Sequence, residues 1–381
     1  MSEWTTKSLG SMCTKIGSGA TPTGGKESYR TEGISLIRSQ NVEDFVFLYN
    51  GLAHIDDEQA RRLNNVSIVA NDTLVNITGD SVARVCSVPD NILPARVNQH
   101  VAIVRADGVQ LDNTFAKYML LAMKEQLLSI AEIGATRRAL TKEMLENLEV
   151  SCPNLDTQKA IAEVLTSLDD KVGLLTRQNA TLESLTQTYF QEWFVENNTE
   201  MGRLDSIADI TMGQSPKGES YNEDGNGTVF FQGRGEFGWR YPTIRLYTTA
   251  PQQMAHKGDI LMSVRAPVGD INVAETDCCI GRGLAAIRSQ YHTFTLYAIK
   301  SQGDQLDIFN GEGTIFGSIS KEGLNGLQIP LPSEALIKQF ENRFFIIDKK
   351  IERNSAQILT LQKLRDTLLP KLISGEVRVR Q

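Results

Sequence analysis

Two long heptad patterns constrain this chain more than any other feature of its sequence. Between Ile161 and Trp193, apolar residues recur at alternating steps of four and three, and only Asn179 and Thr186 interrupt them. This is the spacing of a coiled-coil seam. A helix over residues 157–194 would reach roughly 55 Å, which exceeds what one small domain needs to cover its own core. The pattern therefore predicts a long helix that acts as a spacer.

The same spacing returns between Phe340 and Leu372, near the end of the chain. Residues 140–194 align without a gap on residues 319–373, and the alignment pairs Asp169 with Asp348. We interpret the chain as a tandem duplication of one unit, a globular domain followed by a long helix. The period is too long for a solenoid repeat.

These features predict an α+β fold class, with two tandem-duplicated globular domains separated by two long helices that form an antiparallel coiled coil with pseudo-twofold symmetry. A chain of 381 residues is large for one hydrophobic core, which agrees with two domains. The predicted divisions are a first domain at 1–153, a central helix at 154–200, a second domain at 201–332 and a C-terminal helix at 333–381. The predicted seam residues are Ile161, Leu165, Leu168, Val172, Leu175, Leu182, Phe340, Phe344, Ile347, Ile351, Ile358 and Leu361.

Each domain is predicted to contain a small half-buried sheet. Apolar β-type runs lie at 34–37, 73–77 and 101–104 in the first domain and at 260–264 and 284–287 in the second. Asn113 is predicted to cap a helix that continues to Glu132, and Asp156 is predicted to cap the central long helix.

The charge of the chain argues against a DNA-binding protein that acts alone. It has 39 Lys and Arg against 46 Asp and Glu, which gives a formal net charge of −7. Sequence-independent affinity for nucleic acid comes from cations that neutralise phosphates. Either nucleic acid is not the ligand, or partner subunits supply much of the phosphate contact.

Targeting and metal-binding patterns are missing. No apolar run approaches the length of a membrane span, and the N-terminus lacks a secretion signal, so we expect a soluble, cytoplasmic protein with no membrane partner. The five cysteines, at positions 13, 86, 152, 278 and 279, have neither C-x-x-C nor metal-ligand spacing. They favour reduced thiols and no metal site.

The patterns of common catalytic sites are also missing. The four histidines lie far apart and show no metal-binding spacing. A G-x-G-x-x-G run at 233–238 does not fit a dinucleotide site, because the residues that follow it, 239–242, do not begin a helix. These gaps favour a binding protein over an enzyme, and they predict no catalytic residues.

Loops dense in Arg, Gln, Asn and Lys are the remaining candidates for function. Arg can pair with guanine and Asn or Gln with adenine through two hydrogen bonds. The alternative is that these side chains cap turns or hold internal hydrogen bonds, and that the adjacent Arg137 and Arg138 are simply solvated rather than bound to phosphate. The candidate DNA-binding residues are Arg38, Gln40, Asn41, Arg96, Asn98, Arg137, Arg138, Gln214, Lys217, Gln232, Arg234, Arg265 and Arg282.

Over its whole length the chain resembles the DNA-specificity (S) subunit of type I restriction-modification enzymes. The order of domain, helix, domain, helix carries the resemblance, together with residues 348–351 and 364–376 of the second helix. Residues 263–270 (SVRAPVGD) and 280–286 (IGRGLAA) look like second-domain motifs of the family, whereas the first domain has NITGD at 76–80 instead.

The resemblance implies that each globular domain is a target recognition domain that reads half of a split DNA sequence, spaced by the paired helices. It also implies two methylation subunits as partners, with S-adenosylmethionine bound by them and no cofactor bound by this chain, and a motor-nuclease subunit in the full complex. Two distinct readers imply an asymmetric double-stranded DNA target. A coiled-coil scaffold that binds only proteins and a self-sufficient enzyme are the alternatives.

Overall fold

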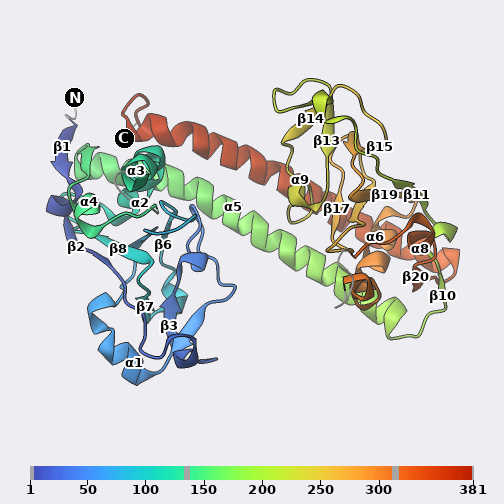
Figure 1. Cartoon of the computed structure of the whole chain (residues 1–381), viewed down its shortest axis with the longest axis horizontal. Coiled ribbons are helices and arrows are strands. Elements are labelled where there is room, and N and C mark those ends of the chain that lie inside the picture. The colour runs from blue at the N-terminus through green and yellow to red at the C-terminus, as the bar shows by residue number, and fades with distance from the viewer. Residues whose placement is uncertain (1–3, 133–137, 311–316, 380–381) are drawn as a thin grey trace. The chain divides into compact units, whose positions relative to one another are not determined.

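The computed structural model describes residues 4–132, 138–310 and 317–379. The chain forms two compact units, each with its own hydrophobic core (Figure 1). The first unit comprises Met1–Leu175 together with Gln357–Gln381, and the second comprises Thr176–Ala356. Each long helix contributes one part to each unit. Within the described ranges, no helix combines the length and the apolar character that a membrane span requires.

Three small sheets form the first unit. Its strands are β1 (Thr5–Ser8), β2 (Cys13–Ser18), β3 (Ile34–Ile37), β4 (Ala53–Ile55), β5 (Thr73–Asn76), β6 (Val85–Ser87), β7 (Ala95–Val97), β8 (Val101–Ala106) and β9 (Glu149–Cys152). An antiparallel sheet has the order β2-β8-β5-β6, and a second sheet has the order β4-β3-β7, in which β3 and β7 are parallel. Strand β1 pairs with β9. The predicted runs at 34–37, 73–77 and 101–104 are thus confirmed as strands, although they belong to two sheets.

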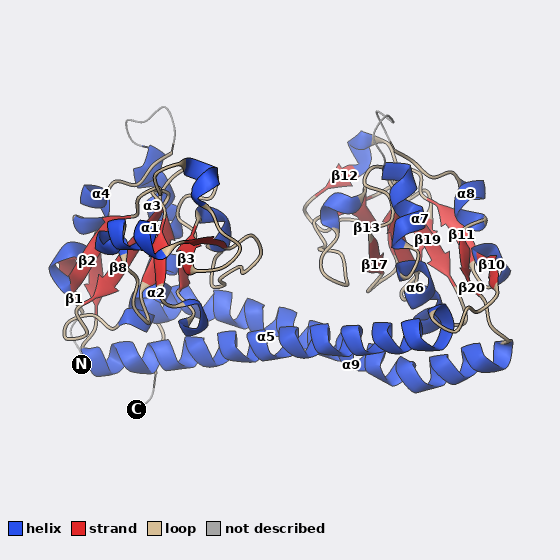
Figure 2. Ribbon diagram, turned by 90° about the horizontal axis from the view of Figure 1, so that it is seen from below, coloured by secondary structure: helices blue, strands red, loops and turns tan. Residues whose placement is uncertain are grey.

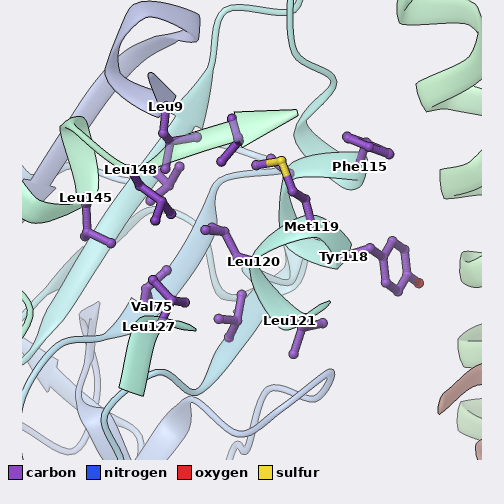
Figure 3. Close-up of a cluster of buried hydrophobic side chains, with 14 of the residues drawn as sticks. Leu9, Val75, Phe115, Tyr118, Met119, Leu120, Leu121, Leu127, Leu145 and Leu148 are labelled. Atoms are coloured by element: carbon purple, nitrogen blue, oxygen red, sulfur yellow. The ribbon is translucent and has the colours of Figure 1, made fainter. Parts of the chain in front are cut away.

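Short helices and the start of a long helix accompany the sheets of the first unit. They are α1 (Asp57–Arg62), α2 (Asn113–Ala122), α3 (Lys124–Glu132), α4 (Lys142–Glu146) and the first part of α5 (Leu155–Phe190). The core between them buries apolar side chains from β2, β5 and β8 and from all of these helices except α1. Figure 3 shows Leu9, Leu145 and Leu148 at one end of this core and Tyr118 at the other.

Two local predictions were wrong. The helix predicted from Asn113 to Glu132 divides at Met123, and its cap is Asp112, whose carboxylate accepts a hydrogen bond from the Phe115 N–H at 2.9 Å. The long helix is capped by Asn154 rather than by Asp156, because the Asn154 side chain accepts the Thr157 N–H at 2.9 Å. In both cases the capping residue lies just before the predicted one, where side-chain oxygens meet unpaired N–H groups.

The second unit repeats the same plan. Its strands are β10 (Met201–Arg203), β11 (Asp209–Met212), β12 (Tyr221–Asn222), β13 (Thr228–Phe231), β14 (Leu246–Thr248), β15 (Met254–Ala255), β16 (Ile260–Ser263), β17 (Ile271–Val273), β18 (Cys278–Ile280), β19 (Leu284–Arg288) and β20 (Gln328–Pro330). The sheet β11-β19-β16-β17 matches β2-β8-β5-β6, and the β14-β13-β18 portion of a five-stranded sheet matches β4-β3-β7, including its parallel pair. This correspondence confirms the duplication in the upstream part of each unit, where the sequences have diverged.

Aromatic side chains dominate the core of the second unit. Its helices are α6 (His292–Lys300), α7 (Gly303–Asp307), α8 (Lys321–Asn325) and the first part of α9 (Glu334–Ile373), and α5 ends here in a π-helical turn over Gln191–Val195. Phe190 lies 5.5 Å from both Phe294 and Phe340, measured between ring centroids. Helix α6 is therefore packed directly onto the long helices.

The long helices are antiparallel where they pair. In the second unit, Asn179, Tyr189 and Trp193 of α5 contact Asn354, Phe344 and Phe340 of α9 in that order, so rising numbers on one helix meet falling numbers on the other. In the first unit, Asp169 of α5 meets Arg365 of α9. Every predicted seam side chain is buried or half-buried. Figure 2 shows these helix segments alongside the strands in each unit. The predicted fold class is confirmed.

A half-buried aspartate on α5 joins the first domain to the helices. The Asp169 carboxylate accepts hydrogen bonds from the Tyr118 hydroxyl at 2.6 Å and from Arg365 Nη1 at 2.9 Å, and Lys117 Nζ lies 3.6 Å away. Burial lowers the pKa of Lys117, and the charge of Asp169 opposes that shift. The Arg365 guanidinium also lies over the Phe45 ring, 3.4 Å from its centroid.

The second unit uses the equivalent aspartate. Asp348 accepts a hydrogen bond at 2.7 Å from Arg240, which is 3% exposed and also contacts Glu183 at 3.3 Å. Burial alone would lower the pKa of Arg240, but the carboxylate of Asp348 holds it above its ordinary value. The guanidinium lies over the Tyr297 ring, and Tyr297 occupies the position that Tyr118 has in the first unit.

We predict that Arg365→Ala lowers the free energy of unfolding by about 3 kcal/mol, because the change removes a buried cation that pairs with the half-buried Asp169 and stacks on Phe45. Chemical denaturation measures the loss. Lys363→Ala, an exposed change on the same helix, is the matched control and should leave stability within about 0.5 kcal/mol of the unchanged protein. Equal stability of both variants would contradict a structural role for this ion pair.

Candidate nucleic-acid interface

In the second unit, three segments meet with no space between their backbones. The Gly281 N–H donates to the Phe231 carbonyl at 2.8 Å, and the Gln214 N–H donates to the Ile280 carbonyl at 2.9 Å. A Cβ added to Gly213 would lie 2.1 Å from the Gly281 carbonyl oxygen, so the close approach requires glycine there. The segments at 213–214, 231–233 and 280–283 are thereby fixed to one another.

A tight turn at 263–270 extends this group of segments. The Ser263 hydroxyl donates to the Pro267 carbonyl at 2.8 Å and accepts the Asp270 N–H at 2.9 Å. Val264 connects the turn to its neighbours, because its N–H donates to the Gly283 carbonyl at 2.9 Å and its carbonyl accepts the Ile319 N–H at 3.1 Å. Ser263 therefore closes the turn, and the side chain of Arg265 is free to project.

The segments at 213–214, 231–233, 263–270 and 280–283 together form a backbone frame. Two arginines project from this frame. Arg265 and Arg282 are exposed and line one pocket of about 370 Å³ with Gly317 and Ser318. Among the described residues, neither guanidinium has a hydrogen-bond or ion-pair partner. Arg234 is also exposed, but it forms an ion pair with Asp270 of the turn. Two unpaired cations on a rigid backbone are suited to an anionic or base-edge ligand.

The other candidates in the second unit lie around the same frame. Gln214, Lys217 and Gln232 are all exposed. Backbone hydrogen bonds hold the loops, through the N–H of Gln214 and the carbonyls of Lys217 and Gly281. The side chains of Gln214, Lys217 and Gln232 are therefore left directed to solvent. The structure therefore brings Gln214, Gln232, Arg234, Arg265 and Arg282 onto adjoining segments of one frame, and Lys217 lies in the loop that follows Gln214.

The first unit builds the same frame from different residues. The Asn98 N–H donates to the Ile37 carbonyl at 3.0 Å, as Gly281 does to Phe231. The Ile77 N–H donates to the His100 carbonyl at 3.0 Å, and the Leu140 N–H donates to the Ile77 carbonyl at 2.8 Å, as Ile319 does to Val264. Matching these bonds places Thr78 where the second unit has Arg265, Gln99 where it has Arg282, and Arg38 where it has Gln232.

Several first-unit candidates are occupied by internal contacts. The buried Asn41 amide donates to the Leu48 carbonyl at 2.9 Å, and its oxygen accepts the Arg38 N–H at 3.0 Å. Arg96 donates to the Ala60 carbonyl at 3.1 Å, and burial lowers its pKa. Asn98 is buried, and its oxygen accepts the His100 N–H at 3.0 Å.

The remaining first-unit candidates are more accessible. Arg38 is half-buried, and its guanidinium donates to the Gly51 carbonyl at 2.5 Å. Gln40 is exposed, and its amide donates to the same carbonyl at 3.1 Å. Arg138 is exposed and forms an ion pair with Glu132 at 2.6 Å. Arg137 lies outside the described residues.

The sequence analysis missed Thr78, Gln99 and His100 in the first unit. The Thr78 hydroxyl lies 2.6 Å from His100 Nδ1, and the Gln99 amide nitrogen lies 3.0 Å from His100 Nε2. Thr78 and Gln99 occupy the positions at which the second unit carries Arg265 and Arg282, whereas His100 matches Gly283. The Gln99 oxygen also accepts a hydrogen bond from the Thr21 hydroxyl. The sequence offered no signal for Gln99, because Asn98 is buried directly after the buried Val97 and strand alternation does not separate it from Gln99.

Known proteins are similar to this chain in sequence and in fold. Residues 1–184 match the family described as "Type I restriction modification DNA specificity domain". A Methanocaldococcus jannaschii protein, provisionally named the specificity subunit of the type I restriction enzyme MjaX, is 26% identical over 99% of this chain and 94% of its own length. The MjaIX specificity subunit of the same organism is 22% identical over 96% of this chain and 92% of its own length. Residues 1–184 thus match the type I specificity-domain family, and the chain is similar to type I specificity subunits over nearly its whole length.

The fold of the specificity subunits is shared as well. The crystal structure of the S subunit of a type I restriction-modification system from M. genitalium covers 97% of this chain and 96% of its own, with a TM-score of 0.64 and 19% sequence identity. In this chain, no group of three or more His, Cys, Asp or Glu side chains suited to a metal ion occurs within residues 4–132, 138–310 and 317–379.

We predict that Gly213→Ala disrupts the frame of the second unit, because its Cβ would overlap the Gly281 carbonyl. The expected result is a loss of several degrees in Tm, the effect of roughly 1–3 kcal/mol of backbone displacement. Gly218→Ala is the matched control, since a Cβ there meets nothing within 4 Å. A Gly213→Ala variant as stable as the control would show that the close approach is not required.

Proposed function

We propose that this chain is the DNA-specificity subunit of a type I restriction-modification complex, and that it recognises a bipartite, asymmetric DNA target. The observation that carries the proposal is the backbone frame that both units share, on which one end of the sheets presents exposed Arg and Gln side chains and a half-buried Thr. A constant frame with variable side chains is suited to reading different sequences with one architecture. Similarity to type I specificity subunits supports the same function.

The two frames present different chemistry. The second unit carries Arg265 and Arg282 where the first carries Thr78 and Gln99. A guanidinium suits the two acceptors of guanine, whereas an amide suits the donor and acceptor of adenine. Each unit would therefore read a different half-site, and the complete target would not be a palindrome.

Partner subunits complete the proposal. The complex contains DNA and further restriction-modification subunits, and we propose two methylation subunits and a motor-nuclease subunit among them. A net charge of −7 supports shared phosphate contacts, since this chain has few cations to spare for the duplex. S-adenosylmethionine would bind to the methylation subunits, which would methylate adenine, and cleavage would belong to the motor-nuclease subunit.

We further propose that the chain itself is not catalytic. The exposed arginines and glutamines of the frames provide binding groups rather than a nucleophile with an adjacent base. A protein-binding scaffold without DNA specificity is not favoured, because it gives no role to the two frames and does not agree with the similarity to specificity subunits.

Methyl transfer tests the proposal directly. Labelled S-adenosylmethionine and a library of DNA duplexes would be incubated with the chain alone, with a methylation subunit alone, and with both together. The expected result is methylation only in the combined sample, on one split motif. Transfer by the chain alone would overturn its non-catalytic role, and transfer without sequence preference would overturn its role in specificity.

We predict that Arg265→Ala or Arg282→Ala costs about 1–3 kcal/mol of affinity for the target and relaxes preference at one base pair of the second half-site. Affinity for the methylated motif and its single-base variants measures both effects. A phosphate contact would instead weaken binding to all sequences and reduce the salt dependence.

Arg353→Ala, an exposed change on α9, is the control and should leave affinity unchanged. Arg234→Ala should have a smaller effect, because Asp270 already pairs with that guanidinium. Unchanged affinity and discrimination in both the Arg265 and the Arg282 variants would contradict their assignment to base reading.

A further inference from the structure

One polar layer interrupts the apolar helix seam in the second unit. Asn179 is 2% exposed and Asn354 is 1% exposed, and each lies on a different long helix. The Asn354 amide donates to the Asn179 oxygen at 2.8 Å and to Gln178 Oε1 at 2.9 Å, and the Asn179 amide donates to Ser355 Oγ at 3.2 Å. These bonds satisfy both buried amides across the helix pair.

The duplication shows that this layer is present only once. The ungapped alignment of the two helices pairs Asn179 with Ile358 and Leu175 with Asn354. The layer that corresponds to Asn179–Asn354 by the duplication is therefore Leu175–Ile358, which is apolar. A buried polar layer in one copy of a duplicated seam distinguishes the two helices from each other.

A second polar layer, formed by Asp169 and Arg365, is also present in only one copy of the duplicated seam. Asp169 of α5 pairs with Arg365 of α9 at 2.9 Å, and the corresponding residues are Asp348 and Thr186. Thr186 is buried and its hydroxyl donates to the Leu182 carbonyl at 3.1 Å, so this layer contains no cation from the opposite helix. The carboxylate of Asp348 takes its cation, Arg240, from the globular domain instead.

We propose that the Asn179–Asn354 pair, supported by Asp169–Arg365, selects pairing of α5 with α9 against pairing of like helices from two copies of this chain. In an α5–α5 pair, the duplication places Leu175 opposite Asn179 and Thr186 opposite Asp169. The Asn179 oxygen would lose its donor and Asp169 would lose Arg365, twice in each symmetric pair. Buried polar groups that lose their partners disfavour such an arrangement.

Selection between partners is needed because both helices carry the same apolar spacing, so each could also pair with a copy of itself. Helix α5 is synthesised before α9, so an α5 helix on a second copy is an available partner during assembly. Two first domains joined by an α5–α5 pair would present two identical frames. If the proposed function is correct, such an assembly would read a palindrome, and the asparagine pair keeps the target asymmetric.

A cysteine beside the polar layer reports which helices have paired. Gln178 is exposed and lies next to this layer. In an antiparallel α5–α5 pair, the two copies of residue 178 would lie on either side of the twofold axis, whereas in the α5–α9 pair residue 178 has no copy of itself nearby. A disulfide between two copies of Gln178→Cys is therefore diagnostic of like pairing.

The test compares two variants of the full chain that differ in the residues of the helix seam. One carries Gln178→Cys alone, and the other adds Asn179→Ile and Asn354→Leu, which give each position the residue of its duplicate. Both would be refolded from denaturant over concentrations that reach the millimolar range typical of a tethered partner, then oxidised and examined on a non-reducing gel. We expect the altered seam to yield about tenfold more disulfide-linked dimer, the factor associated with one buried hydrogen bond.

Controls separate selection from simple stability. Arg177→Cys, at an exposed position turned away from the seam, should give no dimer in either seam. Asn179→Ile alone should lower Tm because it leaves Asn354 buried without its partner, and the double change should restore or raise Tm. Equal dimer yields in the two seams, with both proteins folded, would overturn the proposal. The assay contains no DNA, so its outcome is independent of the proposed function.

Discussion

The two units depend on a carboxylate of a long helix that bonds to side chains of the adjacent domain. Asp169 and Asp348 occupy equivalent positions in the duplicated helices, and each lies near a tyrosine at an equivalent position, Tyr118 or Tyr297, although their cations come from different places in the chain. A buried charge is stable only when its partners are in place, so the contact fixes how the domain packs on the helices within each unit. Apolar contacts alone would allow many more arrangements, because dispersion and burial have little directionality.

A second constraint is the close packing of backbone at one end of each pair of sheets. Gly213 and Gly281 in one unit, and Gly19 against the Val97 carbonyl in the other, allow segments from distant parts of the chain to touch without side chains between them. Because backbone hydrogen bonds hold these segments, the side chains that project from them can change without loss of the frame. The two units use this freedom, with arginines in one and an amide and a hydroxyl in the other. This separation of frame from projecting groups explains how one fold can serve proteins that recognise different ligands.

The helices and the duplication were predicted from the sequence more accurately than the residues of the candidate site. The seam follows from a period that repeats over many turns, and the local error at each helix start was a shift to a neighbouring polar residue. Candidate residues were harder to place, because Asn41, Asn98 and the exposed Gln99 are chemically alike in the sequence and differ only in burial. Thr78 and His100 gave no signal of their own. They were found by matching the backbone hydrogen bonds of the two units.

The sequence by itself determined that this protein has two copies of a domain joined to a long helix, because periodicity and internal similarity are properties of residue order. It also determined which side chains are chemically able to contact DNA. Only the tertiary structure decided which of them are free to do so, since the partners of Asn41, Arg96 and Asn98 come from residues distant along the chain or from backbone groups whose direction the sequence does not specify. Pairing partners in a folded chain depend on which segments come together in space, and that is fixed by packing rather than by local pattern.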